Sequence, residues 1–213
     1  SAFVGGVKQV QKGNVDFKTA LIFGIPAILS VIFVRSTLIP IIPDEIFSIY
    51  GISITRRMGM FGLFALIMIP AALAMLNPLS TSLNTNKTEQ LNYNYIFMPL
   101  QGAVIGMLTG IVGAGGGFLI IPTLVIITRI DIKTAIGTSL VIVTLQSLIG
   151  FFLGDAQSMA IDWGFLLLFT SIAVVGIFIG SYLNHKINEQ KLRKRFGYFI
   201  LLMAVLIFYM EFL

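Results

Sequence analysis

The sequence predicts an all-α protein that crosses a membrane several times, and composition and segment length carry this prediction. Hydrophobic residues make up 57% of the 213 residues and charged residues only 11%, whereas a soluble domain is about a quarter charged. The mean hydropathy is +0.97. Whole segments are apolar on every face, as suits helices surrounded by lipid. A chain of this length has room for about five or six spans of roughly 20 residues each.

Long apolar segments mark the expected membrane helices. They cover residues 19–42, 58–76, 96–127, 134–153, 161–183 and 196–213. Residues 1–7 read like the end of a further membrane helix. They are not a signal peptide, because they lack its charged lead and long apolar core. We therefore expect the chain to be truncated at its N-terminal side.

The two halves of the chain resemble each other and predict an internal repeat. Residues 1–37 align with residues 147–183 without a gap, so that Asp16 pairs with Asp162. A basic pair, a glycine and an aromatic residue open the last span of each half. Repeats of this kind are common in transporter folds, although apolar composition alone can produce some of the similarity.

The repeat divides the chain into three parts. We expect a remnant of the first transmembrane repeat at 1–76, a polar linker at 77–95 and a complete second transmembrane repeat at 96–213. The first half would then lack its own copies of the third segment and of most of the fourth. Whether the two halves are inverted or parallel stays open, because the distribution of basic residues fits both arrangements.

The third apolar segment, residues 96–127, is too long for one crossing and contains a run of glycines. As one helix it would measure about 50 Å, against a hydrocarbon core of about 30 Å. Freed backbone is tolerated at membrane depth only where protein or a wet cavity receives it, and amides at a new helix start suit an anion. We predict a broken or re-entrant helix whose tip binds substrate. The glycines concerned are Gly113, Gly115, Gly116 and Gly117.

Other functions of these glycines compete with substrate binding. The run could serve helix packing alone, as we expect for Gly102, Gly106 and Gly110, which recur at four-residue spacing. A phosphate-binding loop is excluded, because no Lys-Ser or Lys-Thr pair follows the glycines.

The fourth apolar segment contributes polar groups on one helical face. The predicted substrate-binding residues there are Thr138, Ser139, Gln146 and Ser147. Hydroxyl and amide groups can replace water around an anion without adding a negative charge. The alternative is ordinary hydrogen bonding within or between helices. Arg35 lies at the end of the first segment, where we expect it to extend toward the interface rather than to bind substrate.

Several functions are excluded by what the sequence lacks. It has no cysteine and one histidine, and no acidic residues cluster within the spans, so neither a catalytic acid–base set nor a metal site can be assembled. We therefore expect no enzyme activity, no cofactor and no metal. The basic residues concentrate in a short loop, as in cytoplasmic loops of membrane proteins, so that no nucleic-acid partner is expected. These loop residues are Lys186, Lys191, Arg193, Lys194 and Arg195.

At these motifs the chain resembles the sulfite exporter TauE/SafE family, also called the four-toluene-sulfonate uptake permease family. The similar stretches are residues 102–110, residues 113–122 and residues 135–140. The resemblance implies about eight membrane segments in two repeated halves, and transport of sulfite, sulfonates, sulfoacetate or related anions. The chain departs from the family pattern in lacking a glycine-rich hairpin in its first half.

Together these features predict a secondary transporter of small anions in the inner membrane of a bacterium. No nucleotide-binding motif is present, so a proton, a sodium ion or the substrate's own gradient must drive transport. The alternatives are a passive anion channel and a membrane protein that does not transport. Substrate identity, direction of transport, the coupling ion and the oligomeric state stay open.

Overall fold

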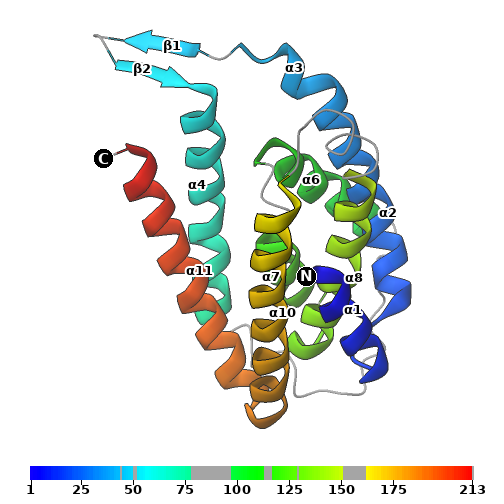
Figure 1. Cartoon of the computed structure of the whole chain (residues 1–213). Coiled ribbons are helices and arrows are strands. Elements are labelled where there is room, and N and C mark those ends of the chain that lie inside the picture. Colours follow the sequence, from blue (N-terminus) through cyan, green and yellow to red (C-terminus); the bar gives the residue numbers. More distant parts are fainter. Residues whose placement is uncertain are drawn as a thin grey trace.

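Helices make up most of the described chain (Figure 1). The computed structural model describes residues 1–43, 45–49, 52–77, 97–112, 117–128, 130–150 and 162–212. The helices are α1 Ala2–Gln11, α2 Phe17–Phe33, the π-helical turn η1 Val34–Leu38, α3 Ile39–Ile41, α4 Arg56–Leu76, α6 Phe97–Val112, α7 Gly117–Ile126, α8 Ile132–Gly150, α10 Trp163–Lys186 and α11 Glu189–Phe212. The strands are β1 Glu45–Ile49 and β2 Ile52–Thr55.

Four of the described helical stretches are long and apolar enough to cross a membrane. They are Phe17–Ile41, Arg56–Leu76, Ile132–Ile149 and Trp163–Leu183. The prediction of an all-α, multi-pass membrane protein is therefore confirmed. The third apolar segment contains two shorter helices, α6 and α7, and α11 carries the sixth segment behind a polar first turn.

The sequence prediction missed a small antiparallel hairpin of β1 and β2. It projects at one end of the bundle, between α3 and α4 (Figure 1). Glu45 pairs with Thr55 and Ile49 with Ile52. Its strands are rich in isoleucine, which favours extended backbone, but each is too short to show a clear alternating pattern.

Two helices start with the same aspartate cap. Asp16 precedes α2, and its Oδ1 accepts hydrogen bonds from the backbone amides of Lys18 and Thr19. Asp162 precedes α10, and its Oδ1 accepts from the amides of Gly164 and Phe165. Such caps satisfy amides that have no partner inside the helix. The caps occupy the aligned positions of the two halves, while the repeat itself stays a prediction.

Glycines allow α6 to lie directly on α2. A Cβ atom added to Gly102 would lie 2.3 Å from the carbonyl oxygen of Phe23, and one added to Gly106 would lie 2.3 Å from that of Ala27. One added to Gly110 would lie 3.0 Å from Cβ of Val34. Residue numbers rise together along both helices, so α6 runs parallel to α2.

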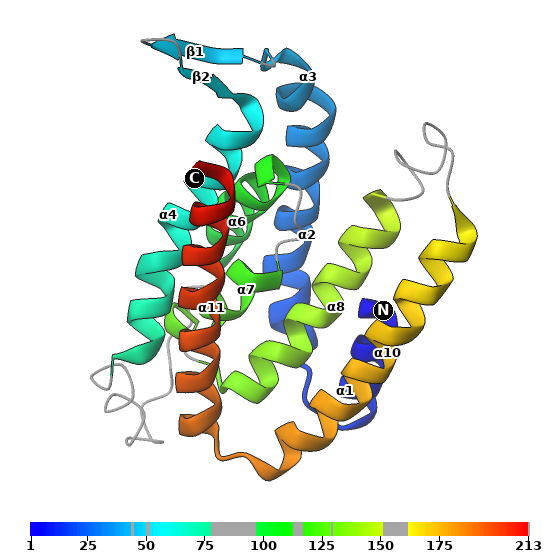
Figure 2. The ribbon, with the colours of Figure 1, turned by 60° about the vertical axis from the view of Figure 1, so that its left-hand side comes forward.

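The helix α7 runs opposite to α6. Gly117, at the start of α7, faces Val143, and α7 ends shortly before α8 begins, so α7 and α8 form an antiparallel pair. The helix α8 rises in the same direction as α2 (Figure 2). Since α6 is parallel to α2, the helices α6 and α7 point in opposite directions.

The buried core lies around α7 (Figure 2). Its side chains come from five helices: Phe23 of α2, Met68 of α4, Ile120 of α7, Ile142 of α8 and Ile200 of α11. The helices α4 and α11 pair antiparallel at one side. The helix α10 contacts α1 and is otherwise largely exposed, with 6% of its apolar window buried.

Basic residues gather at the end of the bundle where α1 ends and α2 begins, which is the lower end in Figure 1. Those in described elements are Lys8, Lys12, Lys18, Lys133, Lys186, Lys191, Arg193, Lys194 and Arg195. At the opposite end lie Arg35, Arg56 and Arg57. In helical membrane proteins the more basic end commonly faces the cytoplasm.

Candidate substrate-binding site

The glycine run is only partly within the described residues. Gly113, Gly115 and Gly116 lie outside them, whereas Gly117 is the first residue of α7. A Cβ added to Gly117 would lie 3.5 Å from a methyl carbon of Val143. The start of α7 is therefore level with the second half of α8, the part that carries Gln146 and Ser147.

Gln146 has an unsatisfied amide in this region. Its side chain is 8% exposed, and its Nε2 has no hydrogen-bond partner among the described residues. Gln146 follows Ile142 and Val143 by four and three residues, so it shares their face of α8. Those two side chains contact Gly24 of α2 and Gly117 of α7. A buried amide donor without a partner is unfavourable by about 1–3 kcal/mol.

Ser147 follows Gln146 but has an exposed side chain. The structure therefore brings Gly117, Gln146 and Ser147 to a similar height in the bundle. It buries the amide of Gln146 within the helices and leaves the hydroxyl of Ser147 at the surface.

Thr138 and Ser139 lie nearer the basic end. The Oγ1 atom of Thr138 accepts a hydrogen bond of 3.1 Å from the backbone amide of Asp16, in the connection between α1 and α2. The Oγ atom of Ser139 donates to the carbonyl of Ile136 in its own helix, at 2.9 Å. Ser139 precedes Gln146 by seven residues, about 10 Å along the helix axis. The predicted residues thus form two groups at different heights.

A second buried amide was not singled out from the sequence. The Oε1 atom of Gln101 in α6 is buried and has no hydrogen-bond partner among the described residues. Gln101 precedes Gly102, which packs on α2. The signal was present in the sequence, since a glutamine in an otherwise apolar helix is unusual and needs a partner.

The π-helical turn η1 lies beside the end of α6. Val34, its first residue, is buried against Gly110, three residues before the glycine run. Single π-helical turns occur frequently at functional sites. The side chains of Arg35, Ser36 and Thr37 in this turn are exposed.

Comparison with known proteins defines the class to which this bundle belongs. The family model for the sulfite exporter TauE/SafE matches residues 1–207. The arrangement is that of a multi-pass membrane transporter, and the chain belongs to the sulfite exporter TauE/SafE family. The resemblance seen in the sequence is thereby confirmed.

Individual relatives carry transporter names. Two proteins of Xylella fastidiosa, from strains 9a5c and Temecula1, are each named "Probable membrane transporter protein" and are 26% identical over 207 residues. These alignments cover 96% of this chain and 74% of each relative. A protein of Methanocaldococcus jannaschii with the same description is 33% identical over 112 residues, which cover 50% of this chain and 42% of that protein. No solved structure matches the chain.

The described residues contain no group of histidine and acidic side chains that could hold a metal ion. The polar side chains identified near the start of α7 are the amide of Gln146 and the hydroxyl of Ser147. Such a set binds by hydrogen bonding and adds no negative charge next to a bound anion.

Proposed function

We propose that the protein is a secondary transporter of a small anion in the inner membrane of a bacterium, with sulfite and organic sulfonates as the first substrates to test. The observation that carries the proposal is the buried amide of Gln146, whose Nε2 has no hydrogen-bond partner among the described residues. Membership of the sulfite exporter TauE/SafE family supports the substrate class.

The proposed site lies between Gln146 and the start of α7. An anion that leaves water must recover hydrogen bonds, because polar groups left unpaired in an apolar environment are costly. The first amides of α7 have no acceptor inside their helix, and the positive end of the helix dipole lies there. These backbone amides and the amide of Gln146 supply hydrogen-bond donors without a buried full charge. Because no opposite charge holds the anion, it can also be released.

The direction of α6 and α7 fits this site. The helix α6 has 16 residues, so it extends about 24 Å from the basic end, beyond the middle of a hydrocarbon core of about 30 Å.

The coupling ion would be a proton or sodium, because the chain has no nucleotide-binding motif of its own. A passive anion channel is the second candidate, because an uncharged binding site suits rapid conduction of an anion as well as transport by a carrier. Two properties of the flux distinguish them: a carrier saturates and depends on an ion gradient, whereas a channel does neither.

The test is uptake by the full-length protein in proteoliposomes, with sulfite, thiosulfate, taurine and sulfoacetate as substrates. Each substrate is measured over a range of concentrations, with and without an imposed pH or sodium gradient. Saturable, gradient-dependent uptake of at least one of these anions supports the proposal. A flux that neither saturates nor depends on the pH or sodium gradient would identify a channel. Absence of flux for all four anions would reject this substrate class.

A further inference from the structure

A cavity lies between α1, α8 and α10, near the basic end of the bundle. Its volume is about 230 Å³, and Gln146 is not among its lining residues. Ile136, Leu140 and Ile177 form most of an apolar wall. The polar lining consists of Lys8, Gln9 and Ser181.

Lys8 of α1, which lines this cavity, and Lys12, which directly follows α1, both contact α10. The Nζ atom of Lys12 donates to the hydroxyl of Ser181 at 2.9 Å and to its carbonyl at 3.1 Å. The Nζ atom of Lys8, one turn earlier, lies 4.0 Å from the ring centroid of Phe178. A lysine ammonium has three donors. One donor of the Lys12 ammonium is therefore unused, and the ammonium of Lys8 makes no hydrogen bond within the part of the chain that the structure describes.

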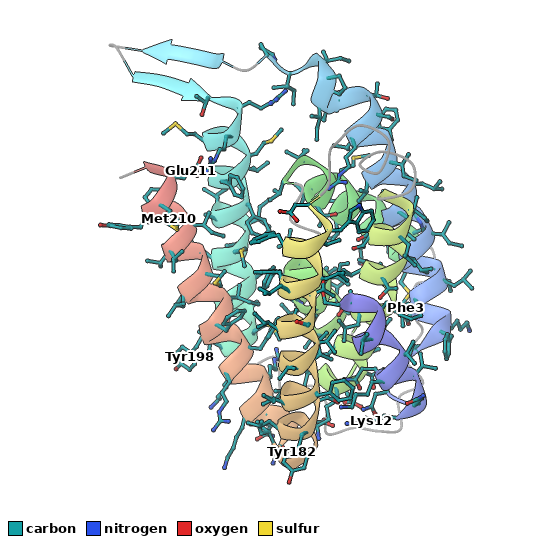
Figure 3. The ribbon with its side chains drawn as sticks, in the orientation of Figure 1. Phe3, Lys12, Tyr182, Tyr198, Met210 and Glu211 are labelled. Carbon is teal, nitrogen blue, oxygen red and sulfur yellow. The ribbon has the colours of Figure 1, made fainter. Side chains whose placement is uncertain are left out.

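The position of the cavity along the bundle matches the level of lipid headgroups. Tyr182 follows Ser181 and is 62% exposed, and Figure 3 shows Tyr182 and Lys12 at the same end of the bundle. Tyrosines concentrate at membrane–water interfaces. We therefore place the lysines near the interface, and the side of α10 next to them is exposed in the described chain.

We propose that this cavity binds an anionic phospholipid of the cytoplasmic leaflet. The phosphate accepts hydrogen bonds from Lys8 and Lys12, and the upper methylenes of an acyl chain pack against Ile136, Leu140 and Ile177. A small soluble anion fits the cavity less well, because its mostly apolar wall cannot replace lost water contacts. The lipid would join α10 to α1, the helix that α10 contacts in the structure.

The charge part of the proposal is tested by melting the purified full-length protein in detergent with added lipid. Phosphatidylglycerol should raise the melting temperature, whereas phosphatidylcholine with the same acyl chains should not. Lys8→Gln should raise about fivefold the phosphatidylglycerol concentration that is needed for half of the stabilisation. Lys194→Gln is the matched control, because Lys194 is an exposed lysine at the same end that does not line the cavity.

The shape part is tested with two glycines of α10. A Cβ on Gly180 or on Gly176 meets no atom within 4 Å, so leucine should be accommodated at either position, but only Gly180 lines the cavity. Gly180→Leu should abolish the phosphatidylglycerol effect, and Gly176→Leu should preserve it.

The same titrations distinguish lipid from a soluble anion. Inorganic sulfate and glycerol phosphate should not reproduce the stabilisation by phosphatidylglycerol. The proposal is overturned if these small anions stabilise equally well, if phosphatidylcholine acts like phosphatidylglycerol, or if Lys8→Gln and Gly180→Leu behave like their controls.

Discussion

Gly106 of α6 lies so close to Ala27 of α2 that a Cβ atom on the glycine would lie 2.3 Å from the alanine carbonyl oxygen. The obstacle is backbone, so no side-chain rotation can relieve it. We expect Gly106→Ala to separate α2 from α6, with a loss of at least about 1–3 kcal/mol, as for overpacked cores. The measurement is the melting temperature and the monodisperse fraction in detergent. Gly176→Ala, at a position with open space, should have the melting temperature of the parent. Equal stability of Gly106→Ala and Gly176→Ala would contradict the close packing of α6 on α2.

An ion pair between α4 and α11 should contribute little to stability. Arg57 Nε lies 3.0 Å from Glu211 Oε1, with side chains 74% and 11% exposed. Because the arginine is mostly exposed, Arg57→Gln should cost no more than about 1 kcal/mol. Arg57→Glu should lower stability more than Arg57→Gln does, because it places two negative charges together. The double variant Arg57→Glu/Glu211→Arg should recover stability. Thermal melts of the four proteins test this, and a double variant no better than Arg57→Glu would argue against the contact.

The opposite directions of α6 and α7 predict which residues share a side of the membrane. The chain has no cysteine, so single cysteines can be introduced without a background signal. Asn77→Cys and Asp131→Cys should react with a membrane-impermeant maleimide from the same side, and Pro43→Cys from the opposite side. Labelling of right-side-out and inside-out vesicles provides the comparison. If Asp131→Cys reacts from the side of Pro43→Cys, the α6–α7 region crosses the membrane once.

Ser139→Ala should have little effect on transport. Although Ser139 was predicted as a substrate ligand from its helical face, its hydroxyl already donates to the carbonyl of Ile136. We expect the KM for the transported anion to stay within about twofold of the parent, because the lost hydrogen bond is internal to the helix. A KM increase of about fivefold or more, at unchanged melting temperature, would restore Ser139 to the binding site.

The helices could be predicted from the sequence because apolar runs of membrane length suit few other structures. The glycine stripe 102–110 likewise predicted close packing through its four-residue spacing. The partner of each polar group could not be predicted. Thr138 bonds the amide of Asp16, which lies 122 residues away in the sequence, and such a contact depends on how α1, α2 and α8 assemble.

The same reason explains what the sequence prediction missed. Helical spacing put Ser139, Gln146 and Ser147 on one face, but it does not tell which of these side chains is buried without a partner. The cavity at Lys8 and Ser181 depends on the contact of α1 with α10, which no local pattern encodes. The π-helical turn at Val34–Leu38 has no clear signature beyond its polar residues.

The central claim, that the amide of Gln146 binds the transported anion, is tested most directly by Gln146→Leu in proteoliposomes with the anion found to be transported. Loss of one hydrogen bond worth about 0.5–1.5 kcal/mol should raise KM about 2- to 13-fold. The melting temperature should stay level or rise, because an unsatisfied buried donor is removed. Ser147→Ala, at the neighbouring exposed position, is the control and should leave KM unchanged. A Gln146→Leu protein that is as stable as the parent and transports with the parental KM would contradict the account.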